Sequence, residues 1–482
     1  MPREARTSER AHWQVLVAYV GLLLTAAVFY LLIRAYGDSL SVSRQPYVMI
    51  VGAGSAAAHM SGFVQVLLAL ALVIAVARAL GSLFRRFHQP AVVGEMVAGI
   101  VLGPSVLGHV APAFAAQILP QSIAPLLNVV SQFGVILYMF LVGLELDLGS
   151  LRHYGGSVLI ISHASIVVPF VLGSGLALFL YPDLASGTAS FTSFSLFLGV
   201  SMSITAFPVL ARILTDCGMH KSNLGILAIA CAAIDDVSAW CLLAVVVAVS
   251  QTRSGGATLT LALAAMYVIS MIVLVRPLVV RMSSWIGNKQ RVSQTALAFV
   301  LLTILLSSLL TETIGIHAIF GAFAVGAVIP HDSFLARDLA AKLEDFVIVF
   351  LLPAFFAFTG LRTQVGLLNG GHEWLLCALT ILIASLGKFG GGAVAAKLNG
   401  FDWRHASALG VLLNTRGLME LIVLNVGLEL NVISPVLFTM LVIMALVTTF
   451  LTTPILHWIV PEHPMEPETS MVAGLNNLLH GD

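Results

Sequence analysis

The sequence has 482 residues, of which 59% are hydrophobic and only 10% are charged, and its mean hydropathy is +1.00. A soluble domain carries about 25% charged residues and could not hide this much apolar surface, so most of the chain is expected to lie in lipid. The net charge of zero does not suggest nucleic acid as a partner. The four cysteines form no close-spaced pair, which supports neither a disulfide framework nor a metal knuckle.

Apolar runs that could cross a bilayer, which takes about 17–25 residues, follow one another along the whole chain. We expect fourteen spans, at residues 13–33, 62–84, 91–107, 124–146, 155–181, 191–214, 222–251, 256–276, 295–312, 314–331, 343–362, 373–397, 405–428 and 432–457. The weakest are 91–107 and 314–331, which are short and rich in glycine. The chain is therefore predicted to be an all-α polytopic membrane protein with 13 or 14 transmembrane helices.

The distribution of positive charge predicts the orientation of these spans. With the N-terminus in the cytoplasm, sixteen of the 23 Lys and Arg fall in cytoplasmic connections and only four in external ones, as the positive-inside rule requires. Both termini are then cytoplasmic.

The ends of the chain are expected to be accessory to one large membrane domain. The run at 13–33 is long for a secretory signal and has no A-x-A site directly after it. We therefore interpret 1–61 as an extra helix with an external linker, 62–458 as the main domain and 459–482 as a short cytoplasmic tail.

The span at 191–214 contains a predicted break. Pro208 removes a backbone donor and frees carbonyl groups one turn earlier. Ser203 and Thr205 supply hydroxyls at the same depth, although such a threonine can also bond back to its own helix.

The next span, 222–251, carries two adjacent carboxylates, Asp235 and Asp236, in an apolar run. One ionised aspartate at a bilayer centre costs roughly 2.5–3.5 kcal/mol, and two neighbours also repel each other. Intramembrane carboxylates usually mark an ion or proton pathway. A buried ion-pair network that only fixes helix packing is the structural alternative.

Lys388 lies at membrane depth in the span at 373–397, beside a run of three glycines that permits close helix approach. A buried ammonium needs a carboxylate partner, and Asp235 or Asp236 is the natural one. Adjacent helical residues project about 100° apart, so one lysine cannot serve both equally. The second carboxylate is then left to face water or an ion, and a proton and a cation can compete for it.

A second break is predicted in the span at 405–428, where polar Asn414, Thr415 and Arg416 interrupt the apolar run. Irregular backbone at membrane depth is tolerated only around a cavity or site. Arg416 and Glu420 are four residues apart and could instead simply pair along their own helix.

The order of these features predicts two inverted repeats. The spans from 155 to 251 form one triplet and those from 373 to 457 a second, which starts an odd number of spans later. Inverted repeats with paired broken helices indicate a binding site near the midplane.

At this point the sequence resembles the monovalent cation:proton antiporter-2 family over residues 62–458. The resemblance rests on four segments in order: Gln89-Pro-Ala-Val-Val-Gly-Glu-Met-Val-Ala-Gly-Ile-Val-Leu-Gly-Pro-Ser-Val-Leu-Gly108, Phe140-Leu-Val-Gly-Leu-Glu-Leu-Asp-Leu148, Ile314-Gly-Ile-His-Ala-Ile-Phe-Gly-Ala-Phe323 and Asn414-Thr-Arg-Gly-Leu-Met-Glu-Leu421. It implies two crossed broken helices in a core of about 155–251 and 373–457, and a second domain for dimerisation. It also implies elevator-like alternating access.

The resemblance also implies roles for individual residues. By this resemblance Asp236 is expected to be the main carrier of cation or proton, and Asp235 the partner of Lys388. Thr205 and the break at 414–416 are expected to lie where the two unwound segments cross. Family members that have both aspartates and the lysine tend to be electrogenic. Departures are the extra helix at 13–33 and the lack of the nucleotide-binding domain found in the potassium-efflux branch.

Other classes of function fit less well. Membrane aspartyl proteases need two carboxylates about 3 Å apart that share a proton, whereas neighbours on one helix diverge. A passive channel needs rings of carbonyls or charges along a pore, and nothing in the sequence suggests them. We interpret His163 and His317 as satisfied core histidines rather than ligands or pH sensors.

The sequence thus predicts an antiporter of Na⁺ or K⁺ and protons in the cytoplasmic membrane, a homodimer that is no enzyme and needs no cofactor. A proton-coupled exporter of an organic cation or ionophore on the same scaffold remains the alternative.

Overall fold

The computed structural model describes residues 2–42, 62–145, 156–187, 189–220, 222–251, 257–286 and 292–460. Within these ranges the chain is helical, and its only strand-like contact is an isolated bridge between Ala185 and Ile433. The main helices are α1 (Pro2–Gly37), α2 (Gly62–Arg86), α3 (Ala91–Leu102), α4 (Leu107–Val110), α5 (Pro112–Ile118), α6 (Ala124–Glu145), α7 (Gly156–Leu184), α8 (Phe191–Ser203), α9 (Phe207–Asp216), α10 (Asn223–Gln251), α11 (Ala257–Ser270), α12 (Arg276–Ile286), α13 (Gln294–Ile314), α14 (Ala318–Val328), α15 (Phe334–Phe346), α16 (Leu352–Arg362), α17 (Gly371–Leu398), α18 (Trp403–Leu413), α19 (Leu418–Glu429) and α20 (Pro435–Ile459).

Twelve of the helical stretches in the described part of the chain are long and apolar enough to cross a membrane, and the bent pair α18–α19 makes up to thirteen. This confirms the predicted fold class. The expected span at 314–331 differs: it forms α14, an apolar helix of only 11 residues. At 1.5 Å per residue α14 covers about half of a bilayer core roughly 30 Å thick.

Two long helices contain π-helical turns, at Met271–Val275 between α11 and α12 and at Val347–Leu351 between α15 and α16. The span predicted at 343–362 is part of a longer apolar stretch, Phe334–Leu367, that forms one candidate membrane span.

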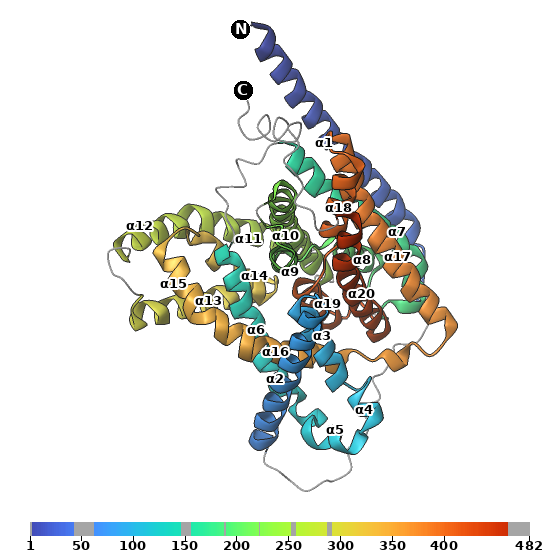
Figure 1. Ribbon diagram of the computed structural model, residues 1–482, viewed down its shortest axis with the longest axis vertical. Helices are drawn as coiled ribbons and strands as arrows, with labels where there is room; N and C mark the ends of the chain where they lie inside the picture. Colours follow the sequence, from blue (N-terminus) through green and yellow to red (C-terminus); the bar gives the residue numbers. More distant parts are fainter. Residues whose placement is uncertain are drawn as a thin grey trace.

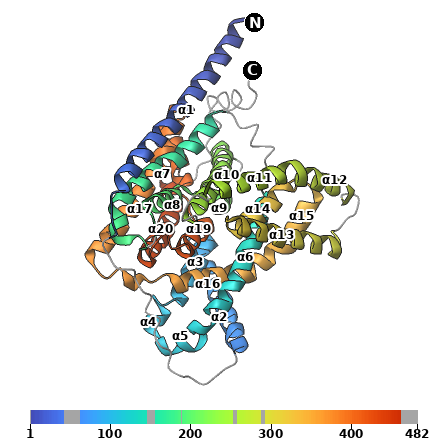
Figure 2. The same cartoon turned by 180° about the vertical axis from the view of Figure 1, so that it is seen from behind.

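The helices pack in two groups (Figures 1 and 2). In what we call the core group, α7 packs against α8, α10 and α17, and α18–α20 complete the bundle. In what we call the scaffold group, α6 packs against α14 and α16, α3 against α2 and α16, and α11–α13 with α15 form a lobe on the side away from α7 and α17. That the two groups act as transport and dimerisation domains stays a prediction.

The scaffold group is held together by very close backbone approach. A Cβ atom built on Gly99 of α3 would lie 2.0 Å from the carbonyl oxygen of Phe356 in α16, and one built on Gly360 would lie 1.9 Å from the oxygen of Gly99. Only glycine fits at both positions, as expected where membrane helices pack through small residues.

Helix α1, the extra helix of the sequence analysis, packs along α7 and also touches α8 (Figure 1). The ring of Tyr19 meets that of His163 edge-on at 5.1 Å between centroids. The extra helix is thus attached to the core group. The predicted linker and tail at 43–61 and 461–482 lie outside the described residues.

Candidate functional site

Two interrupted helices meet in the core group. Helix α8 ends at Ser203 and α9 begins at Phe207, while α18 ends at Leu413 and α19 begins at Leu418 with a bend of 46°. The backbone N–H of Ala206 donates to the carbonyl oxygen of Thr415 at 2.9 Å. The two unwound segments are therefore joined directly, backbone to backbone.

Pro208 lies in the first turn of α9, where a missing backbone N–H leaves no helical hydrogen bond unmade. The interruption itself comes just before it, at 204–206, and leaves the last carbonyl groups of α8 without helical partners.

Two cationic side chains donate hydrogen bonds to these carbonyl groups. The Arg416 guanidinium donates to Ser201 O and Met202 O, both at 2.7 Å. The Lys388 ammonium donates to Ser203 O at 2.5 Å. The carboxyl end of a helix carries partial negative charge, so both cations lie where that charge favours them.

Asp235 is fully buried and its carboxylate is surrounded by donors. Lys388 Nζ lies 2.9 Å from Oδ2, and Thr205 Oγ1 lies 2.7 Å from the same oxygen. From α7, Ser162 donates to Oδ1 at 2.5 Å and Ser165 lies 2.8 Å from Oδ2. Both oxygens of this aspartate are therefore already engaged by donors from neighbouring segments.

Asp236 is different although it is the next residue. Its side chain is 5% exposed, and its Oδ1 atom is buried with no hydrogen-bond partner in the described structure. The carboxylate lies beside the backbone N–H of Phe207, the first residue of α9. A helix amino end attracts negative charge, so α9 holds Asp236 in place while one oxygen remains available.

Thr205 links the two broken helices. Its hydroxyl reaches both Asp235 and the carbonyl oxygen of Leu413, at 3.0 Å, at the end of α18. It has one proton and can donate to one of them at a time. Ser203 instead directs its hydroxyl to the carbonyl oxygens of Ile166 and Gly199, and contributes to the site through its own carbonyl.

Arg416 and Glu420 do pair along their own segment, at 2.9 Å and with both side chains fully buried. Arg416 also anchors the break to α20, because its backbone N–H donates to Thr449 Oγ1 at 3.0 Å. The side-chain oxygens of Asn414 and Thr415 are buried without a partner in the described structure.

The sequence analysis missed the serines. Ser162 and Ser165 lie three residues apart in a span that was already assigned to the first repeat, which places them on one helix face. That spacing was the available signal, but serines are common in membrane helices and do not by themselves indicate a carboxylate partner.

The assembled chemistry consists of oxygen ligands, carboxylates and two fixed cations. Among the described residues no cluster of three or more His, Cys, Asp or Glu could hold a metal ion. A single carboxylate with an unpartnered oxygen instead suits a proton or a hard monovalent cation.

Comparison with known proteins gives close relatives. The sequence matches the family described as sodium/hydrogen exchanger, transmembrane, over residues 67–461. It is 48% identical to the Na⁺/H⁺ antiporter NhaS4 of Synechocystis over 392 residues, 81% of this chain and 96% of the relative.

Eukaryotic relatives are longer. The chain is 40% identical to cation/H⁺ antiporter 20 of Arabidopsis thaliana, covering 80% of this chain and 47% of the relative. It is 36% identical to K⁺/H⁺ antiporter 1 of Saccharomyces cerevisiae, covering 79% and 44%. The chain thus spans about half the length of these two relatives.

Among solved structures, the fold is similar to that of the sodium proton antiporter MjNhaP1 from Methanocaldococcus jannaschii at pH 8. The TM-score is 0.61 at 13% sequence identity, and the match covers 82% of this chain and 99% of the other. At this identity the likeness concerns the fold alone.

Proposed function

The chain belongs to the sodium/hydrogen exchanger family, and on that premise we propose that it exchanges a monovalent alkali cation, Na⁺ or K⁺, for protons across a membrane. The names of its relatives include Na⁺/H⁺, K⁺/H⁺ and general cation/H⁺ antiporters. They support antiport and leave the choice of cation to experiment.

The observation that carries this proposal is the contrast between two neighbouring carboxylates. Asp235 has Lys388 and three hydroxyls within hydrogen-bond distance, on both of its oxygens, while Asp236 keeps an unpartnered oxygen beside a helix break. In the proposed mechanism a proton and a cation compete for Asp236. Release of one permits binding of the other, and this obligatory competition couples the two flows.

The conformational part of the proposal is alternating access by an elevator-like movement. The carboxylates, the lysine and both breaks lie in the core group, so this bundle can move as a unit against the scaffold group. A homodimer joined through the scaffold group, in the cytoplasmic membrane with both termini in the cytoplasm, completes the proposal.

We further propose that exchange is electrogenic. With Lys388 charged and Asp235 ionised, Asp236 alone gives one proton for one cation. A second proton per cation requires the Lys388–Asp235 pair to release a proton when the cation binds. An exchange rate that responds to an imposed membrane potential is the expected sign, and a rate that ignores the potential would limit the stoichiometry to one for one.

The decisive experiment follows proton flux in sealed vesicles that contain the purified protein. A pH gradient is imposed, and Na⁺ or K⁺ is added in turn to wild type, to Asp236→Asn and to Asp216→Asn. Asp216 pairs with Arg212 at 3.1 Å near the exposed end of α9, so its substitution is the matched control.

We expect cation-dependent loss of the gradient in wild type and in Asp216→Asn, and none in Asp236→Asn with its fold intact. The ion that triggers the flux is the cargo. Robust exchange by Asp236→Asn would contradict the assigned role. If folded wild type responds to no alkali cation, the transported cation would instead be an organic one.

A further inference from the structure

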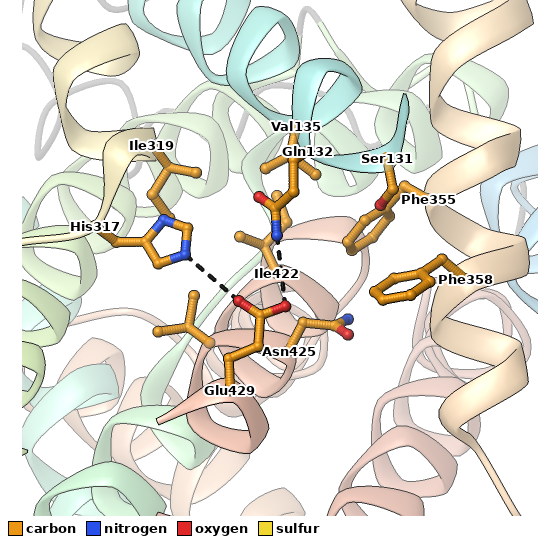
Figure 3. Close-up of a pocket in the computed structure, with 11 residues that line it drawn as sticks. Ser131, Gln132, Val135, His317, Ile319, Phe355, Phe358, Ile422, Asn425 and Glu429 are labelled. Atoms are coloured by element: carbon orange, nitrogen blue, oxygen red, sulfur yellow. Dashed lines mark hydrogen bonds and ion pairs between the residues drawn. The ribbon is translucent and has the colours of Figure 1, made fainter. Parts of the chain in front are cut away.

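A second polar site lies where the two helix groups meet, away from the carboxylate pair. A small cavity of about 10 Å³, enough for about one water molecule, is lined by residues of α6, α14, α16 and α19 (Figure 3). At this place α6 begins and α16 and α19 end. The predicted orientation puts this end on the external side.

Glu429, at the end of α19 in the core group, binds three scaffold helices here. Arg362 of α16 donates to its Oε1 at 3.1 Å, and Gln132 of α6 lies 3.4 Å from the same oxygen. His317, the residue that precedes α14, places its Nε2 atom 3.7 Å from the other oxygen (Figure 3). One carboxylate therefore ties the core group to the scaffold group.

Further contacts fix the orientation of Arg362 and the end of α19. The guanidinium stacks over the ring of Phe358 at 4.1 Å and donates to Asn425 at 3.1 Å. Asn425 in turn donates to Thr359 of α16 at 2.9 Å. The contact between α16 and α19 is complete without any further proton.

His317 is not the satisfied core histidine expected from the sequence. Its Nδ1 atom is buried without a partner in the described structure, and its Nε2 atom faces Glu429 at ion-pair distance. The charged groups that face it are Glu429, Arg362 of α16 and Glu312 of α13, whose carboxylate accepts the N–H of Ala318 at 2.8 Å. The facing side chain of α6, Gln132, is neutral.

Protonation would change this contact in a defined direction. Arg362 already occupies Oε1 of Glu429, and a proton on His317 would place a second cation beside Oε2. The tie between α14 and α19 becomes an ion pair only in that state. Histidine is the side chain that gains its proton between about pH 8 and about pH 5.

We propose that His317 and Glu429 form an external proton-binding site that latches the core group to the scaffold group and slows exchange when the external solution is acidic. The inference rests on the proposed exchange function. It assigns the proton bound here a restraining role, distinct from the proton that is transported.

The first test compares wild type with His317→Gln in vesicles of known orientation, with the external pH varied between about 8 and about 5 and the internal pH fixed. The pH gradient that drives exchange is the same for both proteins, so its effect is removed when one exchange rate is divided by the other. We expect this ratio to rise at least about fivefold towards acid, which is the low end of ordinary coupling between sites.

His163→Gln is the matched control, because the His163 ring is held by Leu159 O at 2.8 Å and by Tyr19, away from this cavity. The ratio of its exchange rate to that of wild type should not change with external pH. A ratio for His317→Gln that does not change with external pH would overturn the proposal.

The second test needs no transport and so separates the latch from the exchange function. Ser131, which lines the cavity and is buried, is replaced by cysteine and labelled from outside with an impermeant maleimide. We expect Glu429→Gln to speed this labelling at least about fivefold. It should leave unchanged the labelling of a cysteine at Ser174 of α7, which is buried against α8.

Unchanged labelling at position 131 in Glu429→Gln would reject the latch even if exchange is confirmed. Faster labelling in a protein that exchanges no alkali cation would keep the latch and reject the proposed cargo instead.

Discussion

At the scale of single residues, Lys388 and Asp235 neutralise each other where neither is exposed to solvent. Taking two charges out of water is expensive, and such a pair often adds little net stability. Removing one partner is nevertheless strongly destabilising because the other charge is left uncompensated.

We therefore predict that Lys388→Ala lowers the free energy of unfolding by about 3–5 kcal/mol, measured by thermal or denaturant unfolding in detergent. The double variant Lys388→Ala/Asp235→Asn should recover a large part of that loss, because it removes the stranded charge. Lys397→Ala, at the half-exposed end of the same helix, is the control and should change stability little. A Lys388→Ala protein as stable as wild type would show that the pair does not stabilise the fold.

The sequence predicted which kinds of residue form the site better than it predicted how those residues are arranged. Lys388 and two carboxylates at membrane depth stand out because their burial is costly. Which carboxylate pairs with the lysine depends on the rotation of α10 relative to α17 and α7, and no local pattern encodes that rotation. The partners of Asp235 on α7, Ser162 and Ser165, were missed for the same reason, and His317 was misassigned.

At the scale of elements, the first half of the second broken helix depends on its amino-terminal cap. Asp402 accepts the N–H groups of Arg404 and His405 at the start of α18, and the His405 ring also contacts its carboxylate. Partial burial raises the pKa of Asp402, but these hydrogen bonds outweigh it and lower the pKa below its ordinary value of 3.8. Because α18 ends at the break, its cap helps to hold the site.

We predict that Asp402→Ala costs about 1 kcal/mol of stability, as removal of a helix cap does. A carboxyl group with a depressed pKa stabilises the fold above its unfolded-state pKa and loses that contribution as pH falls through the folded-state value. The difference in melting temperature between wild type and Asp402→Ala should therefore be full near neutral pH and shrink below about pH 4. Asp402→Asn keeps an acceptor and should retain most of the stability, and a difference that is independent of pH would contradict this account.

Hydropathy predicted which elements exist but not their internal geometry. The apolar residues of α14 continue into its flanking loops, so the run 314–331 looked like a full span although the helix covers only 318–328. The π-helical turns at 271–275 and 347–351 leave no mark in an apolar run.

At the scale of the whole molecule, α1 packs on the core group, while the end of α19 is tied to the scaffold group. If the two groups slide past each other during exchange, cross-links placed within one group and between the groups must behave differently.

We predict that a disulfide between cysteines at Asn425 of α19 and Thr359 of α16, whose side chains lie 2.9 Å apart, arrests exchange, and that reduction restores it. The measurement is cation-dependent proton flux before and after reductant, in a protein whose four native cysteines have been replaced.

The control is a cross-link between cysteines at Tyr19 of α1 and His163 of α7, which should leave exchange intact because α7 belongs to the core group and α1 packs on it. A protein locked between α16 and α19 that still exchanges at the wild-type rate would contradict movement of the core group against the scaffold group.

The joint between the two interrupted helices consists of main-chain atoms, the N–H of Ala206 and the carbonyl oxygen of Thr415. A bond of this kind sets no requirement on the side chains at either position, and only proline at 206 would delete it. The lining of the site can therefore diverge between relatives while its frame persists. For protein engineering, this means that the side chains around the joint can be substituted while the backbone that positions them is kept.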